Sequence, residues 1–243
     1  MAVKILHLYH DIMNLYGDYG NIVILKKHLE DQGLHVIVEE KTLGNEFRLR
    51  DYDFVYIGSG TERNLDVVLE DLRMHLEEIR EYIDNDGILL ATGNSFEMFG
   101  SKIDDQDALK IFDFEVKRDD DRTTSDVIYE SEYFHNKIVG FINMQTKMYH
   151  NMNPLFKVIF GVGENEKNDY EGVKYKNFYG THVSGPIFAR NPEFLEEFVI
   201  KIGKKQDSNF KIKSVRYSNE EEGYELVLRE LTQRNERKKE EKK

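Results

Sequence analysis

The stretch GILLATGNSFEMFG, residues 87–100, is the most informative about the fold, because it combines an apolar run typical of a buried strand with a glycine-bearing turn. The part up to Thr92 is too apolar to alternate between a buried and an exposed face, which is typical of a strand covered on both sides. Many α/β enzymes present their nucleophile on a sharp turn between a strand and a helix. The chain contains no cysteine. This turn therefore predicts either an active site with different chemistry or one that has lost its nucleophile.

The residues before this stretch alternate between strand and helix patterns. Strands are predicted for VKILHLYH (3–10), LHVIVEEK (34–41) and YDFVYIG (52–58). One helix is predicted over residues 21–32, with Asn21 as its cap and Gly33 at its end. A second is predicted over residues 65–84, which keep one apolar stripe. This order predicts an α/β fold, a mostly parallel sheet flanked by helices, with functional residues beyond the carboxyl ends of the strands.

The second half of the chain contains shorter strand-like runs. These are DVIYES, KIVGFINM, FKVIFGVG and GVKYKNFYGTHVSG, and the helical segment NPEFLEEFVIKIGKK follows them. The chain ends in QRNERKKEEKK, which has the composition of a solvated or frayed charged tail. We therefore expect one main domain over residues 1–205 and a charged C-terminal extension over residues 206–243, partly helical or disordered.

The charge and composition exclude several classes of function. Forty-six acidic and 34 basic residues give a formal charge of −12, which disfavours nucleic acid and anionic membranes as partners. No apolar run is long enough for a secretory signal or a membrane span, so we expect a cytoplasmic protein. Without cysteine there is no thiolate metal site, and His7 and His10 would point to opposite faces of a strand. We predict no metal and no cofactor.

Five stretches in series resemble the class I glutamine amidotransferases of the cobyric-acid-synthase (CobB/CobQ) type. LYGDYGN is similar to the family's LYGDRGN, GSGTERN to its loop GGGQDREQ, and ATGNSFEMFG stands in the place of CGGYQLLG. KIVGFINM resembles GFENH, and EGVKYKNFYGTHVSGP resembles EGVRYKNVIGTYLHGP. The resemblance covers about residues 5–202. It is strongest to GatD-type glutaminase subunits, which implies a Mur-ligase-like (MurT-like) partner subunit.

The two positions that carry the family's catalysis are altered in this chain. Aligning Gly100 with the last glycine of CGGYQLLG places Gly93 on the cysteine, and GTHVSGP places Ser184 on the histidine. In the family a thiolate attacks the amide of glutamine and the histidine transfers protons. Glycine offers no atom for a covalent bond. The resemblance therefore implies a catalytically degenerate protein, retained as a noncatalytic partner or regulator of a Mur-ligase-like amide synthase in cell-wall amidation.

The resemblance also implies residues that bind substrate. Arg122 falls where the family's arginine pairs with the carboxylate of glutamine, a task that suits a planar guanidinium. The oxyanion would be bound by the loop of Gly58, Ser59 and Gly60 and by Asn94, the residue after the elbow. Arg122 has an alternative role, since it follows three aspartates that it would neutralise. The same residues suggest an alternative function, a binding module for an amino acid or another carboxylate.

A third hypothesis is a hydrolase with relocated catalytic residues. Ser95 lies in a partial G-x-S-x-G pattern in which Glu97 replaces the last glycine. Its alternative role is to accept a hydrogen bond from a free N–H at a helix start. His182 is the rival base, because residues 182 and 184 of a strand share a face. The alternative for His182 is packing or a hydrogen bond to the backbone.

Overall fold

The computed structural model describes residues 2–150 and 152–241. Residue 1 of the predicted domain and residues 242–243 of the predicted extension lie outside the described residues. The described strands form a single sheet with β2, β1, β3, β4 and β11 parallel to one another in that order. Their bounds are Val36–Lys41, Val3–Leu8, Phe54–Ile57, Ile88–Thr92 and Phe178–Thr181.

Antiparallel strands continue the sheet beyond β11. They are β10 (Tyr170–Tyr175), β9 (Pro154–Phe160) and β7 (Phe114–Glu130), and β8 (Ile138–His150) pairs with β7. The short strand β5 (Lys102–Ile103) then pairs with β7 in parallel, and β6 (Gln106–Asp107) pairs with β5 in the antiparallel direction. The β7–β8 hairpin is longer than its sequence pattern predicted, because the charged residues from 115 to 126 lack the alternation that marks a strand. The predicted α/β fold, with a mostly parallel sheet flanked by helices, is confirmed.

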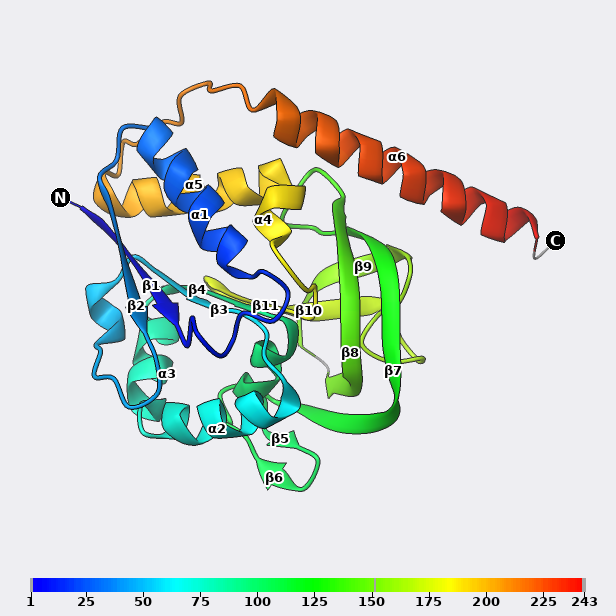
Figure 1. Cartoon of the computed structure of the whole chain (residues 1–243), viewed down its shortest axis with the longest axis horizontal. Helices are drawn as coiled ribbons and strands as arrows, with labels where there is room; N and C mark the ends of the chain where they lie inside the picture. The colour runs from blue at the N-terminus through cyan, green and yellow to red at the C-terminus, as the bar shows by residue number, and fades with distance from the viewer. Residues whose placement is uncertain (1, 151, 242–243) are drawn as a thin grey trace.

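Helices cover both faces of the parallel strands (Figure 1). One face carries α1 (Tyr19–Asp31), α4 (Ile187–Arg190) and α5 (Pro192–Gln206); the other carries α2 (Glu62–Arg73), α3 (Leu76–Asp84) and the 3₁₀ helix η2 (Gly93–Phe99). A further 3₁₀ turn, η1 (Leu49–Asp51), precedes β3. In β3, Val55 and Ile57 pack toward α2, whereas Phe54 and Tyr56 pack toward α1. Burial on both faces explains the continuous apolar runs of these strands.

The helix predicted over residues 65–84 is two helices, so that prediction is wrong. Thr61 caps α2 by accepting a hydrogen bond from the backbone N–H of Asn64. At the other end, the N–H groups of Met74 and His75 bond to carbonyls three residues back, and the His75 ring stacks on Phe47. This tightens the turn and ends the helix. Both helices bury their apolar side in one cluster, so the stripe continues across the break.

The predicted end of the first helix is confirmed, but its predicted cap is wrong. Gly33 adopts a φ of +87° directly after the C-cap residue of α1. The helix begins earlier than expected, at Tyr19, so Asn21 lies inside its first turn. The buried Asn21 amide donates to the Tyr56 hydroxyl at 2.8 Å and accepts from the Phe188 N–H at 3.0 Å. Asn21 therefore ties α1 to β3 and α4 instead of capping.

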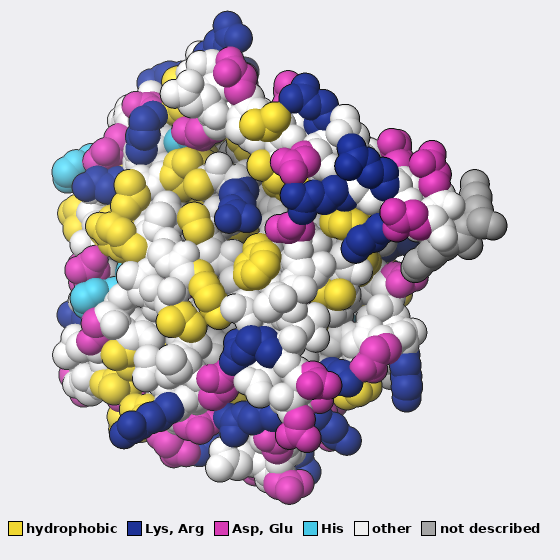
Figure 2. Space-filling view, turned by 45° about the vertical axis from the view of Figure 1, so that its right-hand side comes forward, with side chains coloured by type: hydrophobic (Ala, Val, Ile, Leu, Met, Phe, Trp, Pro, Cys, Tyr) yellow, Lys and Arg dark blue, Asp and Glu magenta, His cyan; other side chains and the backbone are white. Residues whose placement is uncertain are grey.

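The charged C-terminal segment forms the long helix α6 (Ser218–Glu240). It lies along β7, β8 and β9 (Figure 1), where Leu231 packs against Ile128, Val139 and Phe160. Acidic residues in its first turn and basic residues in its last complement the helix dipole. Acidic and basic side chains are intermixed on the face shown in Figure 2. None of the helices in the described ranges is long and apolar enough to cross a membrane.

Candidate functional site

A cavity of about 320 Å³ opens beyond the carboxyl ends of β3 and β4. Its walls come from five separate segments: the loop after β1, the loop after β3, the turn after β4, the β7–β8 hairpin and the segment after β11. Most of the residues proposed from the sequence line it, namely Ser59, Gly60, Gly93, Asn94, Arg122, His182 and Ser184. Gly58 and Ser95 are not among the lining residues. The position agrees with the rule that α/β sheets bind ligands beyond the carboxyl ends of their strands.

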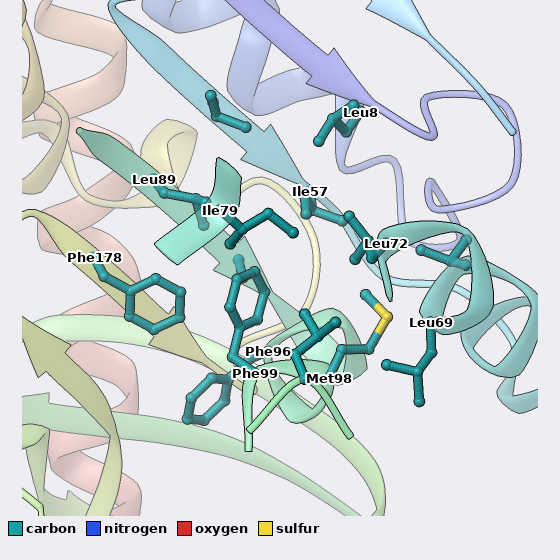
Figure 3. Close-up of a cluster of buried hydrophobic side chains, with 14 of the residues drawn as sticks. Leu8, Ile57, Leu69, Leu72, Ile79, Leu89, Phe96, Met98, Phe99 and Phe178 are labelled. Carbon is teal, nitrogen blue, oxygen red and sulfur yellow. The ribbon is translucent and has the colours of Figure 1, made fainter. Parts of the chain in front are cut away.

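The turn at Gly93 has the backbone of a nucleophile elbow. Gly93 follows β4 directly and has a φ of +61°, which glycine adopts without the strain that a Cβ introduces. The apolar side chains of η2 hold the turn against the hydrophobic core. Figure 3 shows Phe96, Met98 and Phe99 pointing into the cluster that β3, β4 and the helices α2 and α3 bury. The elbow is thus held rigidly, yet the residue at its tip carries no side chain.

Ser184 lines the same cavity as Gly93 from the segment after β11. Its hydroxyl donates to the backbone carbonyl of His182 at 3.3 Å. A serine hydroxyl does not serve as a proton acceptor near neutral pH, whereas the histidine of the resembled motif does. The two positions that would hold the nucleophile and its base therefore border one cavity, and neither supplies the required group.

His182 lies between two buried carboxylates. Its Nδ1 is 3.2 Å from Oε1 of Glu171, and its Nε2 is 3.4 Å from Oε1 of Glu97. The backbone N–H of His182 also donates to Glu171, at 2.7 Å, and the Thr146 hydroxyl donates to Glu97 at 2.6 Å. All four residues are less than a tenth exposed. Sequence analysis missed this cluster, because its members come from η2, β8, β10 and the segment after β11.

The two carboxylates keep His182 protonated. Burial alone lowers the pKa of this imidazole, but the hydrogen bond with Glu171 and the charge interactions with Glu97 and Glu171 outweigh burial and raise the pKa to about 10. A general base at neutral pH needs a free lone pair, which an imidazolium lacks. The geometry therefore supports a structural role for His182, as a cation that neutralises part of the charge of Glu97 and Glu171.

Ser95 points away from the cavity. Its hydroxyl donates to the carbonyls of Thr92 at 2.8 Å and Ile57 at 3.0 Å, and the residue is fully buried. It does not accept a hydrogen bond from a free N–H, as a helix cap would. Instead it joins the end of β3 to the end of β4. In this arrangement Ser95 stabilises the elbow and is not presented to a substrate.

The loop of Gly58, Ser59 and Gly60 is held by hydrogen bonds to Asn94 and Asp18. The Gly60 N–H donates to Oδ1 of Asn94 at 3.0 Å, and Nδ2 of Asn94 donates back to the Gly60 carbonyl at 2.8 Å. The Ser59 hydroxyl donates to the buried carboxylate of Asp18 at 3.1 Å. Asp18 was missed as a site residue, although the motif LYGDYGN contains it. Burial raises the pKa of Asp18, and hydrogen bonds from Tyr16 and Ser59 oppose that effect.

Arg122 lines the cavity from β7, with its guanidinium partly exposed. It donates to Oε1 of Glu62, Oδ1 of Asn143 and Oε1 of Gln145, each at 2.9 Å. Its ion pair is with Glu62 and not with the three aspartates before it. Of those three, Asp119 pairs instead with Lys147 at 2.7 Å. The Glu62 carboxylate thus positions the guanidinium at the cavity. An anionic ligand would have to compete with Glu62 for it.

His7 and His10 do not point to opposite faces, so that expectation is wrong. Strand β1 ends at Leu8, and Tyr9 adopts a φ of +55°, which turns the chain and brings the two rings 6.0 Å apart. His7 is fully buried, and neither of its ring nitrogens has a hydrogen-bond partner. Within residues 2–150 and 152–241, no group of three or more histidines and carboxylates is arranged to hold a metal ion.

The fold is that of a class I glutamine amidotransferase. A glutamine amidotransferase from Thermotoga maritima is similar in structure, with a TM-score of 0.52, 15% identity and coverage of 97% of this chain and 98% of that one. The PurLQS structure from Thermotoga maritima matches with a TM-score of 0.53 and 14% identity over 83% of this chain and 96% of that one. At these identities, the likeness shows the fold.

Sequence comparison defines the family. The model of the CobB/CobQ-like glutamine amidotransferase domain matches residues 4–192, and this chain belongs to that family. The GatD subunit of lipid II isoglutaminyl synthase (glutamine-hydrolyzing) from Streptococcus pneumoniae is 32% identical over 212 residues, 84% of this chain and 82% of the relative. The GatD subunit from Staphylococcus aureus is 29% identical over 218 residues, 88% of this chain and 89% of the relative. The resemblance seen in the sequence is confirmed.

Proposed function

We propose that this chain is a catalytically degenerate GatD-like subunit that acts as a noncatalytic partner or regulator of a Mur-ligase-like amide synthase in cell-wall amidation. One observation carries the proposal: Gly93 and Ser184 border the same cavity on an intact amidotransferase scaffold. Losing either member of a nucleophile and base pair costs about as much rate as losing both, typically several orders of magnitude. With both replaced, the covalent mechanism of the family has no nucleophile.

The partner in this proposal comes from the relatives. Both GatD proteins are named as subunits of lipid II isoglutaminyl synthase, and this chain spans more than four fifths of each. In such an assembly the ligase would activate a carboxyl group with ATP and accept ammonia from solution or from another protein. This chain would then contribute a rigid docking body, held together by the cluster around the elbow.

Ammonia release and partner capture test the proposal together. The purified chain, alone and with a candidate Mur-ligase-like protein, is incubated with glutamine, and free ammonia is measured. We expect no release above the protein-free control, and we expect the ligase to be recovered with the tagged chain from its native host. Sustained ammonia release by the chain alone, or a pull-down that recovers no ligase, contradicts the proposal.

The cavity also favours a second candidate, a binding module for an amino acid or another carboxylate. Arg122 borders a space of about 320 Å³, which is enough for a small ligand. Arg122 and Glu62, which both line the cavity as an ion pair, would suit a ligand that carries both a carboxylate and an ammonium group. Calorimetry against glutamine, glutamate and aspartate separates the candidates, because a sensor binds one of them tightly without a protein partner.

A further inference from the structure

The space in front of Gly93 is filled by Ser59. A Cβ placed on Gly93 would lie 2.6 Å from both Cβ and Oγ of Ser59. Carbon atoms pack at about 3.5–4.0 Å, so this contact is far inside the repulsive range. Rotating the Ser59 side chain moves Oγ but leaves Cβ in place. Any side chain at residue 93, including a cysteine, therefore requires the backbone of one of the two loops to shift.

The Ser59 loop is held against such a shift. Both the hydroxyl and the backbone N–H of Ser59 donate to the buried Asp18 carboxylate, at 3.1 and 3.3 Å. The preceding Gly58 lies so close to Asp18 that a Cβ there would be 2.6 Å from the Asp18 side chain. The loop can therefore neither rotate away from Gly93 nor retreat from it without breaking these contacts.

Asn94 closes a second part of the same site. Its side-chain amide forms two hydrogen bonds with the backbone of Gly60, one with the N–H and one with the carbonyl. A backbone N–H in this loop is the type of donor that stabilises an oxyanion during acyl transfer. In this chain the Gly60 N–H already donates to the side chain of Asn94, so it is not free to donate to an oxyanion. The motifs that these segments resemble, GGGQDREQ and CGGYQLLG, have glycine at both positions, where this chain has Ser59 and Asn94.

We propose that Ser59 and Asn94 form a latch, in which Ser59 occupies the space of the nucleophile and Asn94 occupies the Gly60 N–H. The inference rests on the proposed loss of glutaminase chemistry at Gly93 and Ser184. It adds Ser59 and Asn94 as two further substitutions that prevent this chemistry. Its consequence is that restoring the cysteine and the histidine is insufficient. A working elbow also requires glycine at residues 59 and 94, because only then are the space and the donor free.

A thermal double-mutant cycle tests the Ser59 half of the latch. Gly44→Ala is the matched control, since Gly44 has a similar φ of +71° and a Cβ there meets no atom within 4 Å. We expect Gly44→Ala to lower Tm by about 2–4 °C and Gly93→Ala by at least about twice as much. In the Ser59→Gly background, the cost of Gly93→Ala should fall to that of the control. An equal cost in both backgrounds overturns the Ser59 half.

Amide hydrogen exchange tests the Asn94 half. We expect the Gly60 N–H to exchange at least about ten times faster in Asn94→Ala than in the unmodified chain, because protection depends on the lost acceptor. Asn94→Asp is the matched control, which keeps an oxygen acceptor and should stay protected. Unchanged exchange of Gly60 in Asn94→Ala overturns this half.

Ammonia release by the Gly93→Cys/Ser184→His variant separates the latch from the function on which it rests. We expect this variant to release no more ammonia from glutamine than the unmodified chain. Measurable release by the variant overturns the latch and leaves the proposed function standing. Release by the unmodified chain contradicts the proposed function. In that case the thermal cycle and the exchange measurement still test whether Ser59 and Asn94 form the latch.

Discussion

The Nε2 atom of His182 lies 3.4 Å from Oε1 of Glu97, in a part of the protein where both side chains are almost fully buried. Glu97 stands where the resembled motif has a neutral glutamine. A buried carboxylate at that position needs a cation, since removing a charge from water without a partner costs several kcal/mol. His182 supplies it and pairs with Glu171 at the same time.

This pairing predicts that stability falls in mildly alkaline solution. The pKa of His182 is about 10 in the folded chain and 6.5 as an unperturbed side chain. A raised folded-state pKa gives stability that is fully present below about pH 6.5 and is lost as the pH rises to about 10. We expect the urea midpoint to decrease between pH 7 and 10. A midpoint that stays constant over this range would show that His182 is neutral.

Substituting His182 tests the same cluster directly. His182→Gln leaves Glu97 and Glu171 without a cation and should cost about 3–5 kcal/mol of unfolding free energy. It should also reduce the decrease in stability between pH 7 and pH 10, measured by urea unfolding at both pH values. Glu97→Gln is the matched control: it keeps the shape of the side chain, removes one of the charges and should cost less. Equal losses for both variants would contradict the role of His182 as a shared cation.

His7 predicts a separate sensitivity to acid. Burial, together with repulsion from His10, lowers the pKa of His7 to about 4. The unfolded chain therefore binds a proton that the folded chain does not, and this part of the stability is lost as the pH falls from 6.5 to about 4. We expect His7→Phe to reduce the acid slope measured by urea unfolding. The exposed His35→Gln serves as the control and should leave the slope unchanged.

Substituting Ser95 tests whether its hydroxyl has a structural role or acts as a relocated nucleophile. Ser95→Ala removes the donor to the carbonyls of Ile57 and Thr92 and should cost about 1–3 kcal/mol, the range for leaving a buried acceptor unpaired. We expect ammonia release from glutamine to stay at the level of the unmodified chain. If a measured hydrolytic activity disappears in Ser95→Ala while the protein remains folded, the hydrolase hypothesis gains support.

Arg122 is the test of the binding module. If glutamine, glutamate or aspartate binds in the cavity, Arg122→Gln should weaken it by at least about ten-fold, because a charge-assisted pair contributes about 1.5–3 kcal/mol. Isothermal titration calorimetry measures this change. The control is Arg48→Gln, whose arginine is exposed and pairs with Asp51 outside the cavity. Equal affinity in the Arg122 and Arg48 variants would exclude Arg122 as the ligand-binding group.

The C-terminal helix offers a matched pair of leucines. Leu231 of α6 is 4% exposed and packs against the sheet, whereas Leu226 of the same helix is 54% exposed. We expect Leu231→Ala to cost about 2–5 kcal/mol and Leu226→Ala less than about 0.5 kcal/mol. Urea unfolding measures both. Similar small losses would mean that α6 is not docked on the sheet in solution.

The fold was largely predictable from the sequence, because burial on both sides of a parallel strand leaves a visible pattern of apolar residues. The break between α2 and α3 was not predictable. At the break His75 stacks on Phe47, a contact between segments that are separated in the chain and that no local pattern indicates. The same holds for Asn21, which has the residue type of a helix cap but is used inside the helix to bond Tyr56.

The absence of cysteine can be read directly from the sequence, which also predicts that Gly93 and Ser184 stand at the two catalytic positions of the family and that an α/β sheet presents them. These conclusions follow from residue identity and local periodicity. What fills the site is visible only in the three-dimensional arrangement. The Asn94–Gly60 pair joins residues 34 positions apart, and the contact of Gly93 with Ser59 and the cluster around His182 likewise join separate strands and turns. No local pattern encodes such contacts, because they depend on how the strands align across the sheet.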